Sequence, residues 1–240
     1  MEIPASEKQL LRPALYLVGT PLGNLEDITL RALRTLEQSD VILTEDTRTT
    51  SVVLKHFGIH TPLKSYRVHR EKEDIMFALD RLRAGEAVCL CSEAGMPGVS
   101  DPGSRLVQRI REELPDVPVY PVPGPSALST ALSVCGWQAN PCIFGGFLSV
   151  KPGKRRAFLA SLKGFEGICI VYESVYRIEK LLREIRATLP DRDIFIAREM
   201  TKFHEEYLIF SAQWDEKEFG EMLQKLVKKG EFTVILGIPG

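Results

Sequence analysis

The fold is first indicated by ALYLVGTPLGN, residues 14–24. Its first part, 14–19, is apolar, contains side chains that favour β-structure and ends at a glycine, which indicates a buried β-strand. Its second part, TPLGN, consists of residue types that favour turns. A buried strand followed by a glycine- and proline-containing loop is typical of an α/β protein.

Outward from this stretch, strands and helices alternate through the first half of the chain. Asp27 is expected to cap the first helix, whose apolar stripe includes Leu33 and Leu36. Single helices between strands favour right-handed crossovers and a mainly parallel sheet. Residues 1–122 are therefore expected to form an N-terminal α/β domain. Further strands in it are expected at 41–44, 62–66, 87–91 and 119–122.

Residues 123–240 show a different pattern and are expected to form a second α/β domain. The predicted strands 194–197 and 204–210 follow each other without an intervening helix, so the second sheet should be mixed. Other strands are expected at 168–172 and 232–236, and helices at 126–134, near 154–163, at 175–188 and at 215–228.

Composition limits the functions that the chain can have. Of its 240 residues, 44% are hydrophobic and 26% charged, and no apolar run is long enough to span a bilayer. The first residues lack the apolar core of a signal peptide, so a cytoplasmic location without membrane association is expected. A formal net charge of −1 argues against coating nucleic acid through bulk charge. The odd cysteine number and the lack of a C-x-x-C pair predict buried free thiols and no zinc site.

Four loops hold most of the turn-forming residues, and each follows a predicted strand. Because the carboxyl ends of parallel strands share one edge of a sheet, these loops should meet at a binding site. No dinucleotide G-x-G-x-x-G, Walker A, G-x-S-x-G or H-E-x-x-H motif is present. A ligand held mainly by main chain and small side chains is therefore favoured, and no metal is expected. The loops are 19–24, 45–50, 92–103 and 123–127.

Segments from residue 15 to the C-terminal half carry motifs that can be recognised together. They are LYLVGTPLGNLEDITLRAL (15–33), TEDTRTTSVVLKHFGI (44–59), SEAGMPGVSDPGSRLV (92–107), PVPGPSALSTAL (121–132), GGFLSVKPGKRRAFL (145–159), VYESVYRI (171–178) and AREMTKFHEE (197–206). With them the chain resembles the tetrapyrrole methylase-like superfamily and, within it, the bacterial 16S ribosomal RNA (cytidine 2′-O)-methyltransferases. TPLGN, EDTR and PGPSA are specific for that branch.

The resemblance implies an S-adenosylmethionine-dependent RNA methyltransferase with two α/β domains and a cofactor cleft between them. It further implies a homodimer and 2′-O-methylation of a cytidine ribose in the 16S ribosomal RNA of the small subunit. The cofactor contacts that it implies are Gly19, Thr20, Pro21, Glu93, Ala94, Gly95, Met96, Gly124, Ser126 and Ala127.

On the acceptor side, Asp46 or Glu199 is expected to act as the general base that deprotonates the ribose hydroxyl. Cationic side chains are expected to orient phosphates. The residues expected to bind substrate are Glu45, Arg48, Arg177, Arg198 and Lys202, together with the basic cluster Lys154, Arg155 and Arg156.

Two motifs depart from the pattern of the family. Residues 93–97 are EAGMP where the family usually has DAGTP, and 172–177 are YESVYR where it usually has YESPHR. These departures leave two alternatives beside RNA methylation. One is methylation of a small substrate such as a tetrapyrrole, and the other is a non-catalytic relative that binds cofactor or RNA.

Overall fold

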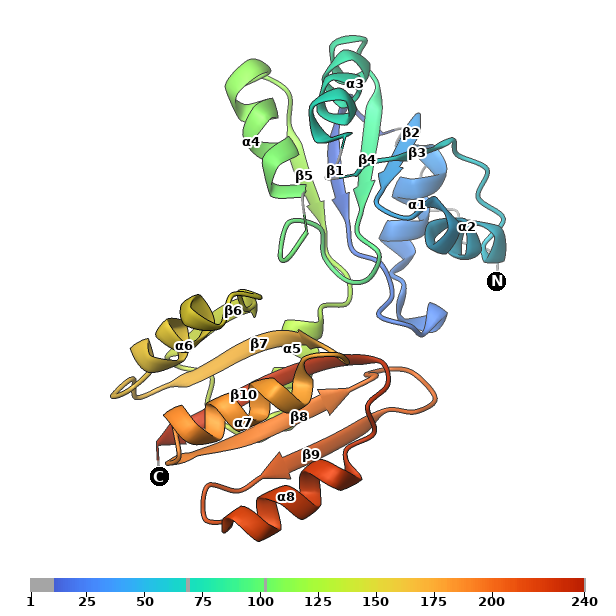
Figure 1. Ribbon diagram of the computed structural model, residues 1–240. Coiled ribbons are helices and arrows are strands. Elements are labelled where there is room, and N and C mark those ends of the chain that lie inside the picture. Colours follow the sequence, from blue (N-terminus) through green and yellow to red (C-terminus); the bar gives the residue numbers. More distant parts are fainter. Residues whose placement is uncertain (1–10, 68–69, 102, 240) are drawn as a thin grey trace. The chain divides into compact units, whose positions relative to one another are not determined.

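The computed structural model describes residues 11–67, 70–101 and 103–239. The chain divides into two compact units, residues 1–126 and 127–240, and Figure 1 shows that each consists of one sheet with helices. The division between Ser126 and Ala127 lies four residues later than the sequence-based boundary.

The first unit contains a five-stranded sheet in the order β3-β2-β4-β1-β5, and every strand pair in it is parallel. The expectation of a mainly parallel sheet is therefore confirmed. The strands are β1 (Ala14–Val18), β2 (Val41–Thr44), β3 (Leu63–Ser65), β4 (Ala87–Cys91) and β5 (Val119–Val122).

The strand order places helices on both faces of this sheet. The chain crosses the sheet in one direction from β1 to β3 and in the other from β3 to β5, so right-handed crossovers put the two helix pairs on opposite sides. In β1, Tyr16 and Val18 pack with α1 and α2, whereas Leu15 packs with α3 and α4. The helices are α1 (Leu30–Gln38), α2 (Thr47–His56), α3 (Glu71–Arg83) and α4 (Gly103–Glu113).

The start of α1 differs from the expectation that Asp27 caps it. A short 3₁₀ turn, η1 (Leu25–Asp27), comes first, and Ile28 after it is extended. The helix therefore begins only at Leu30, where the Thr29 hydroxyl accepts a hydrogen bond from the Ala32 amide at 3.0 Å. Thr29 is the cap because its side chain is the first to reach the free amides of the helix.

The second unit also contains five strands, in the order β6-β7-β10-β8-β9. β6 pairs with β7 in parallel and the other pairs are antiparallel, so the expected mixed sheet is confirmed. The strands are β6 (Cys142–Phe147), β7 (Ile168–Ser174), β8 (Arg192–Arg198), β9 (Glu206–Phe210) and β10 (Glu231–Pro239).

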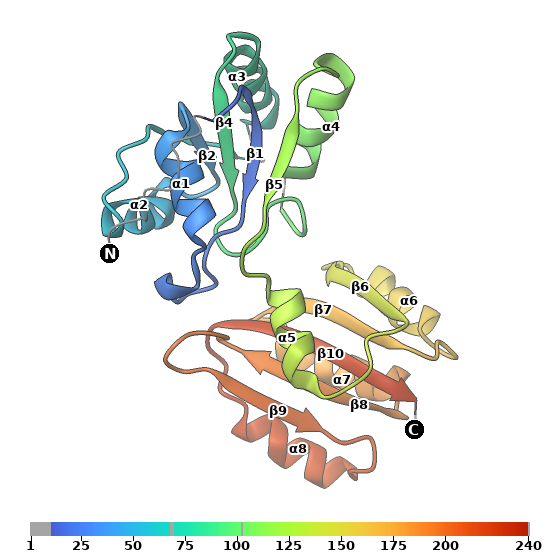
Figure 2. The same cartoon turned by 180° about the vertical axis from the view of Figure 1, so that it is seen from behind.

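Helices cover this second sheet unevenly. One face packs against α6 (Pro152–Ser161), α7 (Ile178–Thr188) and α8 (Glu216–Lys225), and the other packs against α5 (Ala127–Cys135) (Figures 1 and 2). Since α6 and α7 lie side by side on the same face, the groups that they expose can act together.

All five cysteines are free, as expected. Four are buried, and burial raises the pKa of the Cys89 and Cys169 thiols to about 12. Cys142 differs from the expectation because it is exposed on the edge strand β6. None of the described helices has the length and apolar character needed to cross a membrane.

Candidate functional site

Three of the predicted ligand loops meet at the carboxyl edge of the first sheet. The Gly19 amide donates to the Val122 carbonyl at 3.0 Å, which ties the loop after β1 to the end of β5. Thr20 and Gly95 form an isolated antiparallel bridge, with amide-to-carbonyl distances of 3.0 and 3.1 Å. The loops after β1, β4 and β5 are thus joined through main-chain atoms.

Two of these loops approach so closely that neither has room for a side chain. A Cβ atom on Gly19 would lie 2.8 Å from the Gly124 Cα and 2.7 Å from the Met96 Sδ. A Cβ on Gly124 would lie 2.8 Å from the Gly19 carbonyl oxygen. Gly95 has a φ of +83°, a conformation that a side chain disfavours. Glycine at these positions therefore allows the loops to pack main chain against main chain.

Hydroxyl groups stiffen the same loops from inside. The Thr20 Oγ1 donates to the Ser92 carbonyl at 3.2 Å, and the Ser92 Oγ donates to the Gly95 carbonyl at 2.9 Å. Both residues are buried. The amide and the hydroxyl of Thr20 are therefore used within the protein, and this residue shapes the loop rather than offering its hydroxyl to a ligand.

The accessible part of the expected cofactor set lies beside this junction. Glu93 and Ala94 are exposed, and Met96 and Gly124 are partly exposed. β1 and β4 are neighbours whose loops lead to helices on opposite faces, α1 and α4. Ligands of open parallel sheets bind at such a topological switch point.

Asp46 and Arg48 form a local pair at the start of α2. The Asp46 carboxylate caps the helix by accepting from the Arg48 amide at 2.8 Å, and it also pairs with the Arg48 Nη2 at 3.0 Å. The side-chain hydrogen bond from Arg48 is the largest cause that lowers the pKa of Asp46. A carboxylate with a lowered pKa is a weaker proton acceptor, which disfavours Asp46 as the expected base.

Glu45 lies in a different electrostatic environment one residue earlier. Burial raises its pKa first, and the nearby carboxylates of Asp101 and Glu93 raise it further. Asp101 is fixed by hydrogen bonds from the Gly98 and Gly103 amides at 2.8 and 2.7 Å. Three carboxyl groups from the loops after β2 and β4 therefore lie near one another. Sequence reasoning did not single out Asp101, although its place among glycines in the loop 92–103 was a usable signal.

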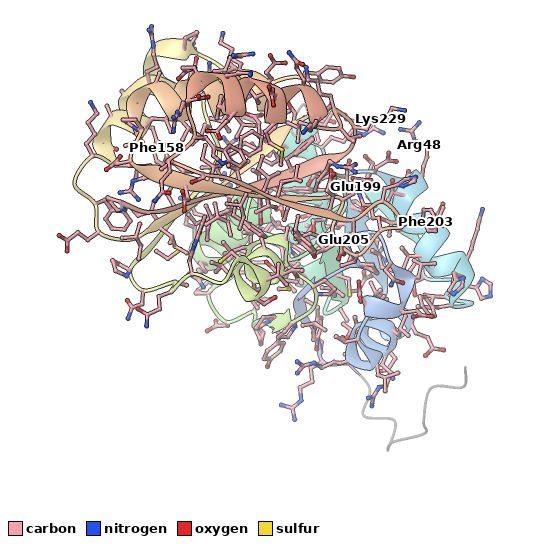
Figure 3. The ribbon with its side chains drawn as sticks, turned by 90° about the horizontal axis from the view of Figure 1, so that it is seen from below. Arg48, Phe158, Glu199, Phe203, Glu205 and Lys229 are labelled. Carbon is pink, nitrogen blue, oxygen red and sulfur yellow. The ribbon has the colours of Figure 1, made fainter. Side chains whose placement is uncertain are left out.

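Glu199, the second expected base, belongs to the second unit, and Figure 3 labels its side chain. Its Oε1 accepts from the Lys202 Nζ and from the Glu231 amide, both at 2.9 Å. Burial alone would raise its pKa, but these two hydrogen bonds and the charges of Lys202 and Arg198 together lower it. Burial acts against the charge of Lys202 too, yet its bonds to Glu231 and Glu199 raise its pKa. Glu199 and Lys202 thus form an internal pair.

Two arginines that were expected to bind substrate serve mainly internal contacts. The Arg198 side chain is 7% exposed and binds the Glu206 carboxylate at 2.8 Å and the His204 carbonyl at 3.0 Å. Arg177 pairs with the buried carboxylate of Glu173 at 2.7 Å. The structure revises the expectation for Arg198, because its guanidinium faces the protein interior.

The expectation for the basic cluster is also revised, because helix α6 points its three cationic side chains in different directions. α6 begins at Pro152, and successive helical residues point in directions about 100° apart. Lys154 and Arg156 are exposed, whereas Arg155 is only 3% exposed and pairs with Glu184 at 2.5 and 2.8 Å. Arg155 is therefore a structural residue and is removed from the expected RNA-binding cluster.

Comparison with known proteins agrees with this architecture. The family model for Tetrapyrrole (Corrin/Porphyrin) Methylases matches residues 14–213. The protein named Ribosomal RNA small subunit methyltransferase I from Thermotoga maritima is 43% identical over 225 residues, which cover 92% of this chain and 97% of that protein. The protein of the same name from Leptospira biflexa is 40% identical over 199 residues, covering 82% of this chain and 81% of that protein.

Solved structures show the same fold at lower identity. A cobalt precorrin-4 methyltransferase matches with a TM-score of 0.68 and 17% identity, over 94% of this chain and 95% of that one. A uroporphyrin-III C-methyltransferase from Thermus thermophilus, complexed with S-adenosyl homocysteine, matches with a TM-score of 0.64 and 21% identity, over 93% and 97% of the two chains.

The chain belongs to the tetrapyrrole methylase family. The resemblance expected from the loops and the expected class of enzyme, a methyltransferase, are therefore confirmed. The expected use of S-adenosylmethionine agrees with the complex of the Thermus thermophilus structure, because S-adenosyl homocysteine is what remains after methyl transfer.

Proposed function

We propose that this protein transfers the methyl group of S-adenosylmethionine to the 2′-hydroxyl of a cytidine ribose in 16S ribosomal RNA. The observation that carries the proposal is 43% identity, over nearly the full length of both chains, to a protein named Ribosomal RNA small subunit methyltransferase I. The cytidine and the 2′-oxygen come from the motifs TPLGN, EDTR and PGPSA.

The residues at the loop junction fit a cofactor held largely by main chain. Gly19, Gly95 and Gly124 add no side-chain atoms of their own where the three loops meet, and the Met96 Sδ lies beside Gly19. Of the expected contacts, Glu93, Ala94 and the partly exposed Met96, Gly124, Ser126 and Ala127 would touch the cofactor, while Gly19, Thr20, Pro21 and Gly95 would shape its site. When bound, the cofactor supplies a methyl group that its sulfonium already activates.

The chain's own residues then have two tasks, orienting the acceptor and accepting its proton. Of Glu45, Asp46 and Glu199, only Glu45 has a raised pKa, the direction that suits a base working near neutral pH. We assign proton acceptance to Glu45 in place of the two bases expected from sequence. The Arg48 side chain is 90% exposed, so its outer face is suited to bind a phosphate.

The proposed function also includes a partner, a cellular location and an oligomeric state. Its partner is the small ribosomal subunit or its RNA, it acts in the cytoplasm, and it functions as a homodimer. The RNA partner rests on the names of the relatives, the homodimer on the resemblance of the motifs, and the location on the expectation from sequence. Light scattering of the purified protein tests the homodimer, since a mass of one 26.9 kDa chain would contradict it.

Incubation with tritiated S-adenosylmethionine tests the substrate class. Purified small subunits and precorrins are offered separately, and label is expected in the ribosomal RNA alone. Nuclease digestion should then release the label as a 2′-O-methylated cytidine. Label in the precorrins and none in RNA would contradict the proposal in favour of a small-substrate methylase. Cofactor binding by calorimetry without transfer to either substrate would indicate a non-catalytic relative.

A further inference from the structure

A groove on the second unit lies between α6 and α7 and has a volume of about 570 Å³. α6 contributes Arg156, and α7 contributes Lys180 and Arg183. Tyr176 lies just before the first turn of α7 at the same groove. The two helices are neighbours on one face of the sheet (Figure 1). The volume is in the range of small-ligand sites and suits about one nucleotide.

The carboxylates of the groove are neutralised by cations of the protein. Glu184 is bound by the buried Arg155 at 2.5 and 2.8 Å. Glu179 pairs with Arg183 at 3.0 Å and with Lys228 at 2.5 Å. Neither acidic side chain therefore leaves an uncompensated negative charge that would repel an anion. The buried Arg155 thus neutralises the charge of Glu184, a residue that lines the groove at the surface.

Arg156 and Lys180 supply the positive charge that is left over. Both are exposed, and among the residues that the structure describes neither has a carboxylate within ion-pair distance. Both line the groove together with Glu184. Two unpaired cations beside neutralised carboxylates form a site for phosphate groups.

Tyr176 supplies a flat apolar surface next to these cations. Tyr176 is 95% exposed, and no ring contact within the described residues involves it. A ring as exposed as this one is accessible to a partner. Unpaired bases of RNA stack on such rings, and stacking strengthens binding whatever the base.

We propose that the α6–α7 groove binds a single-stranded segment of the substrate RNA, with a base stacked on Tyr176 and phosphates held by Arg156 and Lys180. This proposal rests on the proposed function, because it assigns a binding surface for the same RNA. It adds Lys180 to the expected basic residues and excludes Arg155. Single-stranded RNA is favoured over duplex because the groove combines a stacking ring with only two unpaired cations.

Binding of small-subunit RNA at several salt concentrations tests the electrostatic part. The full-length Arg156→Ala/Lys180→Ala variant is compared with wild type and with Lys217→Ala, which removes an exposed cation from α8. Loss of two phosphate contacts should reduce the slope of log affinity against log salt by about 1.4 for single-stranded RNA. The Lys217→Ala control should bind RNA with the affinity and salt slope of wild type, because Lys217 lies on α8 and not in the groove.

The stacking part is tested with Tyr176→Ala and Tyr176→Phe. Replacement by alanine should weaken RNA binding about tenfold or more at every salt concentration without changing the slope, since the ring carries no charge. Phenylalanine retains a stacking ring and should bind like wild type. Equal loss in both variants would contradict stacking on Tyr176.

Calorimetry with S-adenosylmethionine distinguishes RNA binding at the groove from cofactor binding at the loop junction. Each groove variant should bind the cofactor as wild type does, because the loop junction is unchanged. If wild type binds and methylates RNA but the groove variants keep its affinity and salt slope, the groove assignment is contradicted and the proposed function stands. If wild type neither binds nor methylates RNA, both are contradicted.

Discussion

Gly19 and Gly124 show at the scale of single residues why the ligand loops contain glycine. Each would place a Cβ atom 2.8 Å from main-chain atoms of the other, and backbone cannot move aside as the end of a side chain can. The two loops therefore keep their mutual position only if both residues remain glycine. This requirement makes them a sensitive test of the loop junction.

Gly124→Ala should weaken both the fold and cofactor binding. The added methyl group must displace the Gly19 carbonyl, and overpacking of this kind typically destabilises a protein by about 1–3 kcal/mol. Gly153→Ala on α6 is the matched control, because a Cβ there meets nothing within 4 Å. Urea unfolding and calorimetry with S-adenosylmethionine give the two readouts. Wild-type cofactor affinity in Gly124→Ala would show that the junction does not shape the site.

The raised pKa of Glu45 predicts how the stability of the protein depends on pH. Its raised pKa means that the folded chain binds the Glu45 proton more tightly than the unfolded chain does. Ionisation of Glu45 therefore lowers stability as pH rises from the ordinary glutamate pKa through the raised value. Glu45→Gln should be more stable than wild type near neutral pH, and the difference should close below the ordinary pKa, where the carboxyl is protonated in both states.

Urea unfolding of wild type and Glu45→Gln from about pH 7 to about pH 4 measures this difference. The same variant should lose methyl transfer, because an amide cannot accept the ribose proton. A variant that is less stable than wild type at neutral pH would contradict the raised pKa. A variant with wild-type activity would remove Glu45 from the mechanism.

Among the secondary-structure elements, α6 carries two neighbouring arginines in different environments, since Arg155 is buried and Arg156 is exposed. Arg155→Met should destabilise the protein by about 2 kcal/mol, because Glu184 loses its partner at a largely buried position. Arg156→Met should change stability by less than about 0.5 kcal/mol, as exposed substitutions usually do, but should weaken RNA binding. Urea unfolding and RNA binding of the two variants measure both effects. Equal stability of the two variants would contradict the different roles assigned to them.

Elements could be predicted from sequence where the pattern is local. β4 and β5 have the bounds expected from their short apolar runs, and Pro121 is tolerated because β5 is an edge strand. Helix starts were less certain, because Asp27 and Thr29 both have capping side chains and only the extended Ile28 between them decides. The local sequence pattern thus predicts that an element exists more reliably than it predicts the residue at which the element begins.

The candidate site could be predicted only in part for a related reason. The convergence of the loops follows from parallel topology, so Thr20, Gly95 and Gly124 were placed together correctly. The roles of Arg155 and Glu199 could not be predicted, because their partners Glu184 and Glu231 lie far away in sequence. Side-chain pairing across the fold, and not residue type, decides which charges remain available to a substrate.

At the scale of the whole molecule, two units with different sheets are joined in one chain of nearly neutral charge. A formal net charge of −1 gives no general attraction to RNA, so recognition must come from local groups such as Arg48, Arg156 and Lys180. The family provides the methyl-transfer fold, and the surface of this chain must provide the choice of substrate.

Mapping of ribose methylation across 16S ribosomal RNA shows whether this protein methylates a cytidine ribose in that RNA. RNA is compared from cells with the protein, cells without it, and cells without it that carry the Glu45→Gln form. We expect one 2′-O-methylated cytidine that disappears without the protein and is not restored by the variant. Identical methylation of every small-subunit cytidine in the presence and absence of the protein would contradict it.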